Sequence, residues 1–240
     1  MATMLALSGI LFTGDSDIEG WATAAEFPKS VNVGVGGATC ANVAKKAEGH
    51  ISAYAPSTVV LVCGENDLAY GASAAKTMKR LTKAIDRLSS GGARVVYIGT
   101  KPEPSTKSLH KKYRNYDEKV RALARGGGGS FTFIDSYSGF EELGNPNSLY
   151  KNDKLHLSEE GYALWTAWTK AALDGSVCVR GSGTNVEYLE CASSCPPDKW
   201  SAKKCDRKCA GKKAGKCTSD KKAGKKCRSK CETTCGACAV

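Results

Sequence analysis

The chain has 240 residues and an ordinary apolar content of 41%, enough for one sizeable core and a smaller appendage. No run of 18 or more apolar residues occurs, so no transmembrane helix is expected. The net charge of +11 is uneven: residues 1–190 hold 21 Lys and Arg against 20 Asp and Glu, a net of +1, whereas residues 191–240 hold 14 against 4, a net of +10. The basic character therefore belongs to the C-terminal tail and says nothing about a substrate of residues 1–190.

Short apolar strands alternate with helical patterns along residues 8–173. Because this alternation is typical of right-handed βαβ units, it predicts a parallel sheet with helices on both faces. Five strands fit an α/β domain of the flavodoxin-like, three-layer α/β/α type. The expected strands are residues 8–13, 31–34, 58–63, 94–99 and 131–134, and the expected helices are 40–54, 73–89, 106–125 and 158–173.

The first strand ends abruptly in Gly14-Asp15-Ser16. Open α/β sheets keep their sites at the carboxyl ends of the strands, so Ser16 is a candidate nucleophile. Two other interpretations exist: Asp15 as the nucleophile of a haloacid-dehalogenase-like phosphatase, or a turn that caps a helix. The phosphatase pattern needs Thr or Val where Glu19 stands and a later Asp-Asp pair, and the sequence has neither.

Three later segments carry groups that a serine nucleophile needs. Asn32–Thr39 is a glycine-rich stretch after the second strand, where backbone N–H groups can approach a ligand. Asn66 follows the third strand and can direct an amide N–H to the same site. Asp153 precedes His156 by three residues, and such a carboxylate can fix the histidine tautomer through Nδ1. Alone, the glycine-rich stretch also suits a tight turn, the Asn66 segment an Asx-turn or a helix cap, and His156 a structural or solvated histidine.

Together, in this order and spacing, the four segments resemble the SGNH/GDSL hydrolase family over about residues 8–173. The resemblance implies a catalytic triad of Ser16, His156 and Asp153. It also implies an oxyanion hole made by the N–H groups of Ser16 and Gly37 and the side chain of Asn66. The implied activity is that of a serine esterase working through an acyl-serine, with no metal or organic cofactor. No lid insertion is evident, which favours short acyl groups, with acetyl esters on sugars as the leading substrate.

One departure from the family concerns the residue after the serine, which is usually apolar and here is Asp17. With Glu19, Glu65 and Asp67 close to the same segments, it predicts an acidic mouth. Such a mouth would disfavour anionic substrates.

The predicted organisation is a hydrolase domain at residues 1–175, a connector at 176–190 and a basic, Cys-rich tail at 191–240. Nine of the 12 cysteines lie in the tail, which has too few large apolar residues for a core and needs disulfides or metal. The ending Cys231-Glu-Thr-Thr-Cys235-Gly-Ala-Cys238 resembles the close of a ShK toxin-like domain. Zinc binding and a disordered, lysine-rich arm are the alternatives.

The positive tail also suggests a second function class, a polyanion- or polysaccharide-binding protein with a weakly active or inactive hydrolase scaffold. Its near lack of aromatic residues argues against nucleic-acid recognition. The start of the chain shows no secretion signal, because no basic residue precedes its apolar stretch. The Cys-rich tail favours an extracellular or secretory compartment with residues missing upstream; otherwise the protein is expected in the cytoplasm. Nothing in the sequence sets an oligomeric state.

Overall fold

The computed structural model describes residues 9–126, 130–174, 178–179 and 188–189, all of which lie in the unit Met1–Glu190. Five parallel strands form one sheet in the order β2-β1-β3-β4-β5, the order of flavodoxin-like domains. The predicted fold class is therefore confirmed for this unit, while the predicted Cys-rich tail at 191–240 lies outside the described residues. The strands are β1 Ile10–Gly14, β2 Val31–Asn32, β3 Thr58–Val62, β4 Arg94–Ile98 and β5 Phe131–Ile134.

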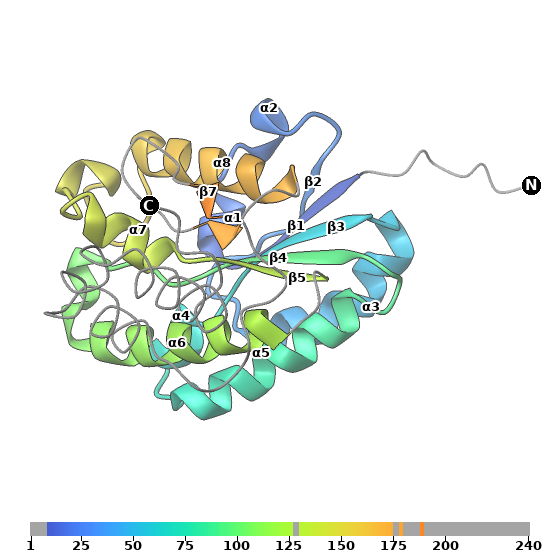
Figure 1. The fold of residues 1–240 in the computed structure, drawn as a ribbon, viewed down its shortest axis with the longest axis horizontal. Coiled ribbons are helices and arrows are strands. Elements are labelled where there is room, and N and C mark those ends of the chain that lie inside the picture. Colours follow the sequence, from blue (N-terminus) through green and yellow to red (C-terminus); the bar gives the residue numbers. More distant parts are fainter. Residues whose placement is uncertain (1–8, 127–129, 175–177, 180–187, 190–240) are drawn as a thin grey trace, which may run out of the picture. The chain divides into compact units, whose positions relative to one another are not determined.

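Helices cover both faces of this sheet (Figure 1). Successive side chains of a strand point to opposite faces, so strands buried on both faces are continuously apolar. In β3, Val59 and Leu61 enter one core and Val60 and Val62 enter the other. The first core is closed by α3 (Cys40–Tyr54), α5 (Ala74–Leu88) and α6 (His110–Gly126), and the second by α1 (Ser16–Glu19), α7 (Ser136–Glu142) and α8 (Glu159–Leu173). Trp21 and Phe27, which flank the short helix α2 (Thr23–Glu26), also enter the second core.

Three of the long helices, α3, α5 and α8, begin at side-chain caps within one residue of the predicted starts. Thr39 and Asn42 form a reciprocal capping box at the start of α3, and Ser158 caps α8 by accepting the Gly161 N–H. Within the described ranges, no helix is both long and apolar enough to cross a membrane.

Several short elements differ from the predictions. The helices α1, α2, α4 (Glu65–Ala69) and α7 were not predicted, because they are too short to show a 3.6-residue period. The predicted helix 106–125 is divided into a 3-10 turn, Pro104–Leu109, and α6. A second 3-10 turn spans Asn147–Leu149. The predicted connector 176–190 contains β6 (Cys178–Val179) and β7 (Tyr188–Leu189), which pair antiparallel.

Candidate active site

Ser16 lies at the carboxyl end of β1, where the strand turns into α1. Gly14 is needed at this turn, because a Cβ there would lie 2.2 Å from the Val62 carbonyl oxygen of the neighbouring strand. The side chain of Asp15 caps α1 by accepting the N–H of Asp17 at 3.1 Å. Ser16 thus becomes the first residue of a helix and is half-buried at the carboxyl ends of the strands.

The loop before α8 brings His156 and Asp153 to this serine. His156 Nε2 lies 3.0 Å from Ser16 Oγ, and Nδ1 lies 2.7 Å from Asp153 Oδ2. Asp153 Oδ1 accepts the N–H groups of Leu155 and His156 at 2.9 and 3.0 Å. The hydrogen bond from His156 lowers the pKa of Asp153 to about 2. Because an ionised carboxylate only accepts, Nδ1 carries the proton and Nε2 is left to accept from the serine hydroxyl.

The glycine-rich loop is held against α1 by Asn32. The Asn32 amide donates to the carbonyl oxygens of Ile18 and Trp21 at 2.7 and 3.1 Å. Farther along the loop, Gly37 has a φ of 71°, a left-handed conformation that favours glycine. The loop is thereby fixed beside the turn that carries Ser16.

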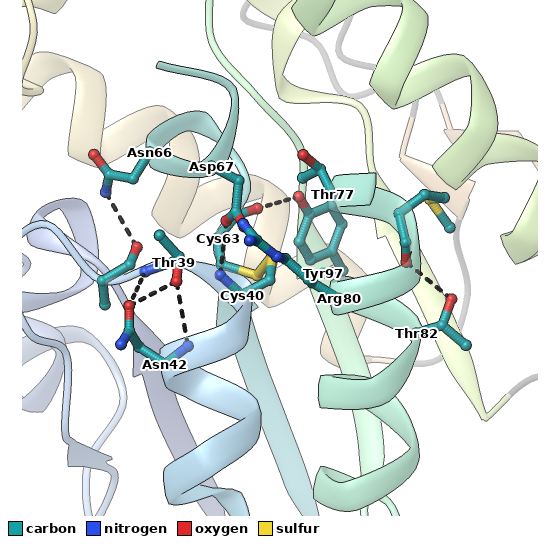
Figure 2. The surroundings of a disulfide bond; sticks show 12 residues. Thr39, Cys40, Asn42, Cys63, Asn66, Asp67, Thr77, Arg80, Thr82 and Tyr97 are labelled. Atoms are coloured by element: carbon teal, nitrogen blue, oxygen red, sulfur yellow. Dashed lines mark hydrogen bonds and ion pairs between the residues drawn. A yellow bond between two sulfur atoms is a disulfide. The ribbon is translucent and has the colours of Figure 1, made fainter. Parts of the chain in front are cut away.

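Asn66 joins this loop to α4. Its Nδ2 donates to the Ala38 carbonyl oxygen at 3.1 Å, and Ala38 directly follows Gly37 in the chain. Figure 2 labels Asn66 and draws this bond as a dashed line. A side-chain amide has two N–H donors, so this bond uses one of them. The structure therefore brings the segments of all five predicted site residues together at one edge of the sheet.

A disulfide links the same two segments (Figure 2). Cys40 stands three residues after Gly37, and Cys63 stands three residues before Asn66. The Cys40 N–H also donates to Asp67 Oδ2 at 2.8 Å. Cys40 follows one predicted oxyanion segment and Cys63 precedes the other, so the sequence already allowed a bridge between them near the site, and the structure pairs them.

The predicted acidic mouth is wrong for Asp17 and Glu65, whose side chains are buried. Asp67 is buried as well, as suits the structural role that the family pattern allows for it. Asp67 is paired with Arg80 at 2.6 Å. Residues that directly follow buried strands can point into the interior, and there these carboxylates meet cations. Glu19 stays exposed and accepts the Gly36 N–H at 3.1 Å.

Lys101 is the residue near the site that the sequence interpretation missed. It follows β4, is only 1% exposed, and its Nζ contacts the carboxylates of Asp17, Glu65 and Glu103 at 2.6, 2.8 and 2.7 Å. In the part of the chain that the structure describes, these three carboxylates are the group whose spacing would suit a metal ion, and the Lys101 ammonium contacts all of them. The signal in the sequence that could have pointed to Lys101 is its position as a charged residue just after the apolar strand at 94–99.

Asp15, the nucleophile of the phosphatase interpretation, is buried and serves as a helix cap. Burial, followed by the nearby charge of Asp17, raises the pKa of Asp15 to about 8. A buried carboxyl that is protonated at neutral pH is a poor nucleophile.

Comparison with known proteins agrees with this geometry. The model of the GDSL-like Lipase/Acylhydrolase family matches residues 13–164. A lipolytic protein of the G-D-S-L family from Veillonella parvula DSM 2008 is 21% identical with a TM-score of 0.59, covering 68% of this chain and 96% of its own. A lipase/acylhydrolase from Enterococcus faecalis is also 21% identical with a TM-score of 0.59, covering 69% of this chain and 95% of its own. No curated protein sequence matches the chain.

A third similar structure is the psychrotrophic esterase EstA from Pseudoalteromonas sp., inhibited by monoethylphosphonate. It is 17% identical with a TM-score of 0.53, covering 70% of this chain and 97% of its own. Because these identities are below 25%, the similarity to the solved structures shows the fold alone. The family model spans more than half of the sequence, from the end of β1 into α8. The chain therefore belongs to the GDSL-like lipase/acylhydrolase family and is a hydrolase.

Proposed function

We propose that the protein hydrolyses short-chain carboxylic esters, acetyl esters of carbohydrates foremost, through an acyl-serine on Ser16. The observation that carries this proposal is the hydrogen-bonded chain from Asp153 through His156 to Ser16. In this mechanism His156 Nε2 takes the proton of Ser16, and Oγ attacks the ester carbonyl carbon. The alcohol leaves with the proton from His156, and a water activated by the same nitrogen then releases the acid.

The negative charge that develops on the carbonyl oxygen requires hydrogen-bond donors. The N–H of Ser16 belongs to the first turn of α1, where N–H groups have no partner within the helix. The Gly37 N–H and the Asn66 amide complete the proposed oxyanion hole. Each donor of this kind stabilises the transition state by roughly 3–4 kcal/mol in other hydrolases.

The surroundings of Gly37 offer an apolar rim next to the proposed oxyanion hole. A cavity of about 200 Å³ adjoins Gly37, and Ser16, Asn66 and His156 are not among the residues that line it. In the described part of the chain, Val35 and Tyr70 are the large apolar side chains that remain exposed, and a Cβ at Gly37 would lie 3.4 Å from the Tyr70 hydroxyl. This apolar rim suits the C–H face of a sugar ring. The cavity is lined by Thr13, Gly14, Val33, Val35, Gly36, Gly37, Ala38, Asn42, Val43, Lys46 and His50.

A panel of esters tests the proposal. We expect the full-length protein to hydrolyse p-nitrophenyl acetate faster than esters of longer acids, and to release acetate from acetylated oligosaccharides. An alkyl fluorophosphonate should label Ser16, as read by peptide mass spectrometry. The highest kcat/KM on a long-chain ester would overturn the short-acyl proposal, and absence of both turnover and label would overturn the esterase.

The Asp15→Asn variant separates the serine mechanism from the phosphatase alternative. Asparagine keeps the acceptor for the Asp17 N–H, so we expect esterase turnover within a few-fold of wild type. The folded state holds a proton on Asp15 up to about pH 8, whereas an unfolded aspartate loses it near 3.8. The stabilisation is therefore present at low pH and is lost as the pH rises through this window.

Asparagine has no such proton to lose. We therefore expect the Tm of Asp15→Asn to fall less than that of wild type between pH 5 and pH 9, as measured by thermal unfolding. An equal fall in both proteins would contradict the buried, protonated carboxyl. Loss of turnover in Asp15→Asn together with its retention in Ser16→Ala would make Asp15 the nucleophile.

Removal of the Cys40–Cys63 disulfide should affect stability more than chemistry. In the Cys40→Ala/Cys63→Ala variant we expect the free energy of unfolding to fall by about 3 kcal/mol, since the closed loop spans a sequence separation of 23. The bond from Asn66 to Ala38 remains, so kcat should fall only severalfold. Denaturant unfolding and p-nitrophenyl acetate assays measure the two effects. Peptide mapping of the unreduced wild-type protein that shows no Cys40–Cys63 linkage would contradict the assignment.

A role for the tail in binding acidic polysaccharide stays a prediction, because residues 191–240 lie outside the described structure. Its positive charge of +10 is the observation that motivates it. Such binding would weaken steeply with salt and would hold the hydrolase near acylated polysaccharide.

A further inference from the structure

The segment Lys101–Ser105, which follows β4, contacts each of the three segments that carry the proposed catalytic groups. Lys101 Nζ contacts Asp17, the residue after Ser16, at 2.6 Å. The Lys101 N–H and Nζ contact the two carboxylate oxygens of Glu65 at 2.7 and 2.8 Å. Ser105 donates its N–H to the Lys154 carbonyl oxygen at 3.0 Å, one residue after Asp153.

Both carboxylate oxygens of Glu103, the second charged residue of this segment, also have close hydrogen-bond partners. Glu103 Oε1 lies 2.7 Å from Lys101 Nζ, and Glu103 Oε2 accepts the hydroxyl groups of Thr106 and Tyr113 at 2.6 and 3.2 Å. Glu65 and Glu103 also share a hydrogen bond. Among the carboxylate oxygens that surround Lys101, Asp17 Oδ1 is the one buried without a partner. The contact from Asp17 Oδ2 to Lys101 is therefore the side-chain bond that holds this carboxylate.

Lys101 is the cation that the three carboxylates of this cluster share. Burial by itself would lower the pKa of the Lys101 ammonium, but the three carboxylates outweigh burial and hold that pKa well above its usual value. Burial, and then the charge of Glu103, raise the pKa of Glu65 well above its usual range. The surroundings therefore favour the charged form of Lys101 and the protonated form of Glu65. Without the ammonium, the remaining buried carboxylates would repel one another.

We propose that Lys101 is a positioning residue for ester hydrolysis: it sets the distance between the Ser16 turn and the Asn66 amide through Asp17 and Glu65. The inference rests on the proposed function and goes beyond it, because no contact of Lys101 reaches the substrate. Lys101 lies opposite the buried Asp17 and gives that acid a partner at 2.6 Å. In active sites, a misplacement of about 1 Å can cost about 100-fold in rate.

The first test is a double-mutant cycle on kcat for p-nitrophenyl acetate. We expect Lys101→Met to lower kcat by about 30-fold with KM within about twofold of wild type, an effect inside the range of such misplacements. In an Asn66→Ala background, the same substitution should cost less than about fivefold, because the amide that Lys101 positions is already absent. Lys170→Met, which removes an exposed ion pair with Glu26, is the matched control and should leave kcat unchanged.

A second pair of variants decides the question if Lys101→Met does not fold. Glu65→Gln keeps one acceptor oxygen for Lys101 but loses the second, so kcat should fall less than about threefold. Glu65→Met loses both contacts to Lys101 and should lower kcat about tenfold, again within the cost of misplacement. Full additivity of Lys101→Met with Asn66→Ala, or equal kcat in the two Glu65 variants, would overturn the inference alone. A wild-type kcat in Asn66→Ala would overturn the proposed oxyanion hole and the inference with it.

Discussion

Ser16→Ala and His156→Ala are each expected to lower kcat by about 10⁴-fold or more while the protein stays folded. Ser16 Oγ is the atom that would form the acyl bond, and His156 Nε2, 3.0 Å away, is the base that would activate it. Neither side chain is part of the buried core, so the Tm should change little. Initial rates on p-nitrophenyl acetate, with thermal unfolding of each variant, measure both effects.

The two substitutions act on one unit, so the double variant Ser16→Ala/His156→Ala should be about as inactive as either single variant. Multiplied losses in the double variant would mean that the two residues act independently. Near-wild-type turnover in Ser16→Ala would exclude the acyl-serine mechanism.

Asn66→Ala is expected to lower kcat by about 100- to 1,000-fold with little change in KM. The reason is that an oxyanion donor is needed mainly in the transition state, when charge develops on the carbonyl oxygen. The amide already donates to the Ala38 carbonyl at 3.1 Å, which holds its orientation before substrate binds. Steady-state kinetics on p-nitrophenyl acetate separates the two parameters.

The exposed Asn115 on α6 provides the control for this experiment. Asn115→Ala removes an amide far along the chain from every proposed site segment and should leave kcat and KM unchanged. A rise in KM alone in Asn66→Ala would make Asn66 a substrate-binding residue. If Asn66→Ala lowers the Tm enough to account for its lower activity, Asn66 has a structural role instead.

The sequence by itself determined the sheet and the place of the site. Continuous apolar runs such as Thr58–Val62 are strands buried on both faces, and their alternation with amphipathic helices predicted the parallel order. The segments around Ser16, Asn66 and His156 each follow a strand or precede a helix. Because the carboxyl ends of parallel strands meet at one edge, their convergence followed from their position along the chain.

The tertiary structure alone decided which charges and cysteines meet. Asp17 and Glu65 were predicted to make the mouth acidic, but both are buried against Lys101, which follows a different strand. The pairing of Cys40 with Cys63 likewise joins a helix start to a strand end. Strand and helix periods, caps and turns are local signals, readable within a few residues of sequence. Ion pairs and disulfides join segments far apart in the chain, and only the packing of the sheet and its helices brings those segments within contact distance.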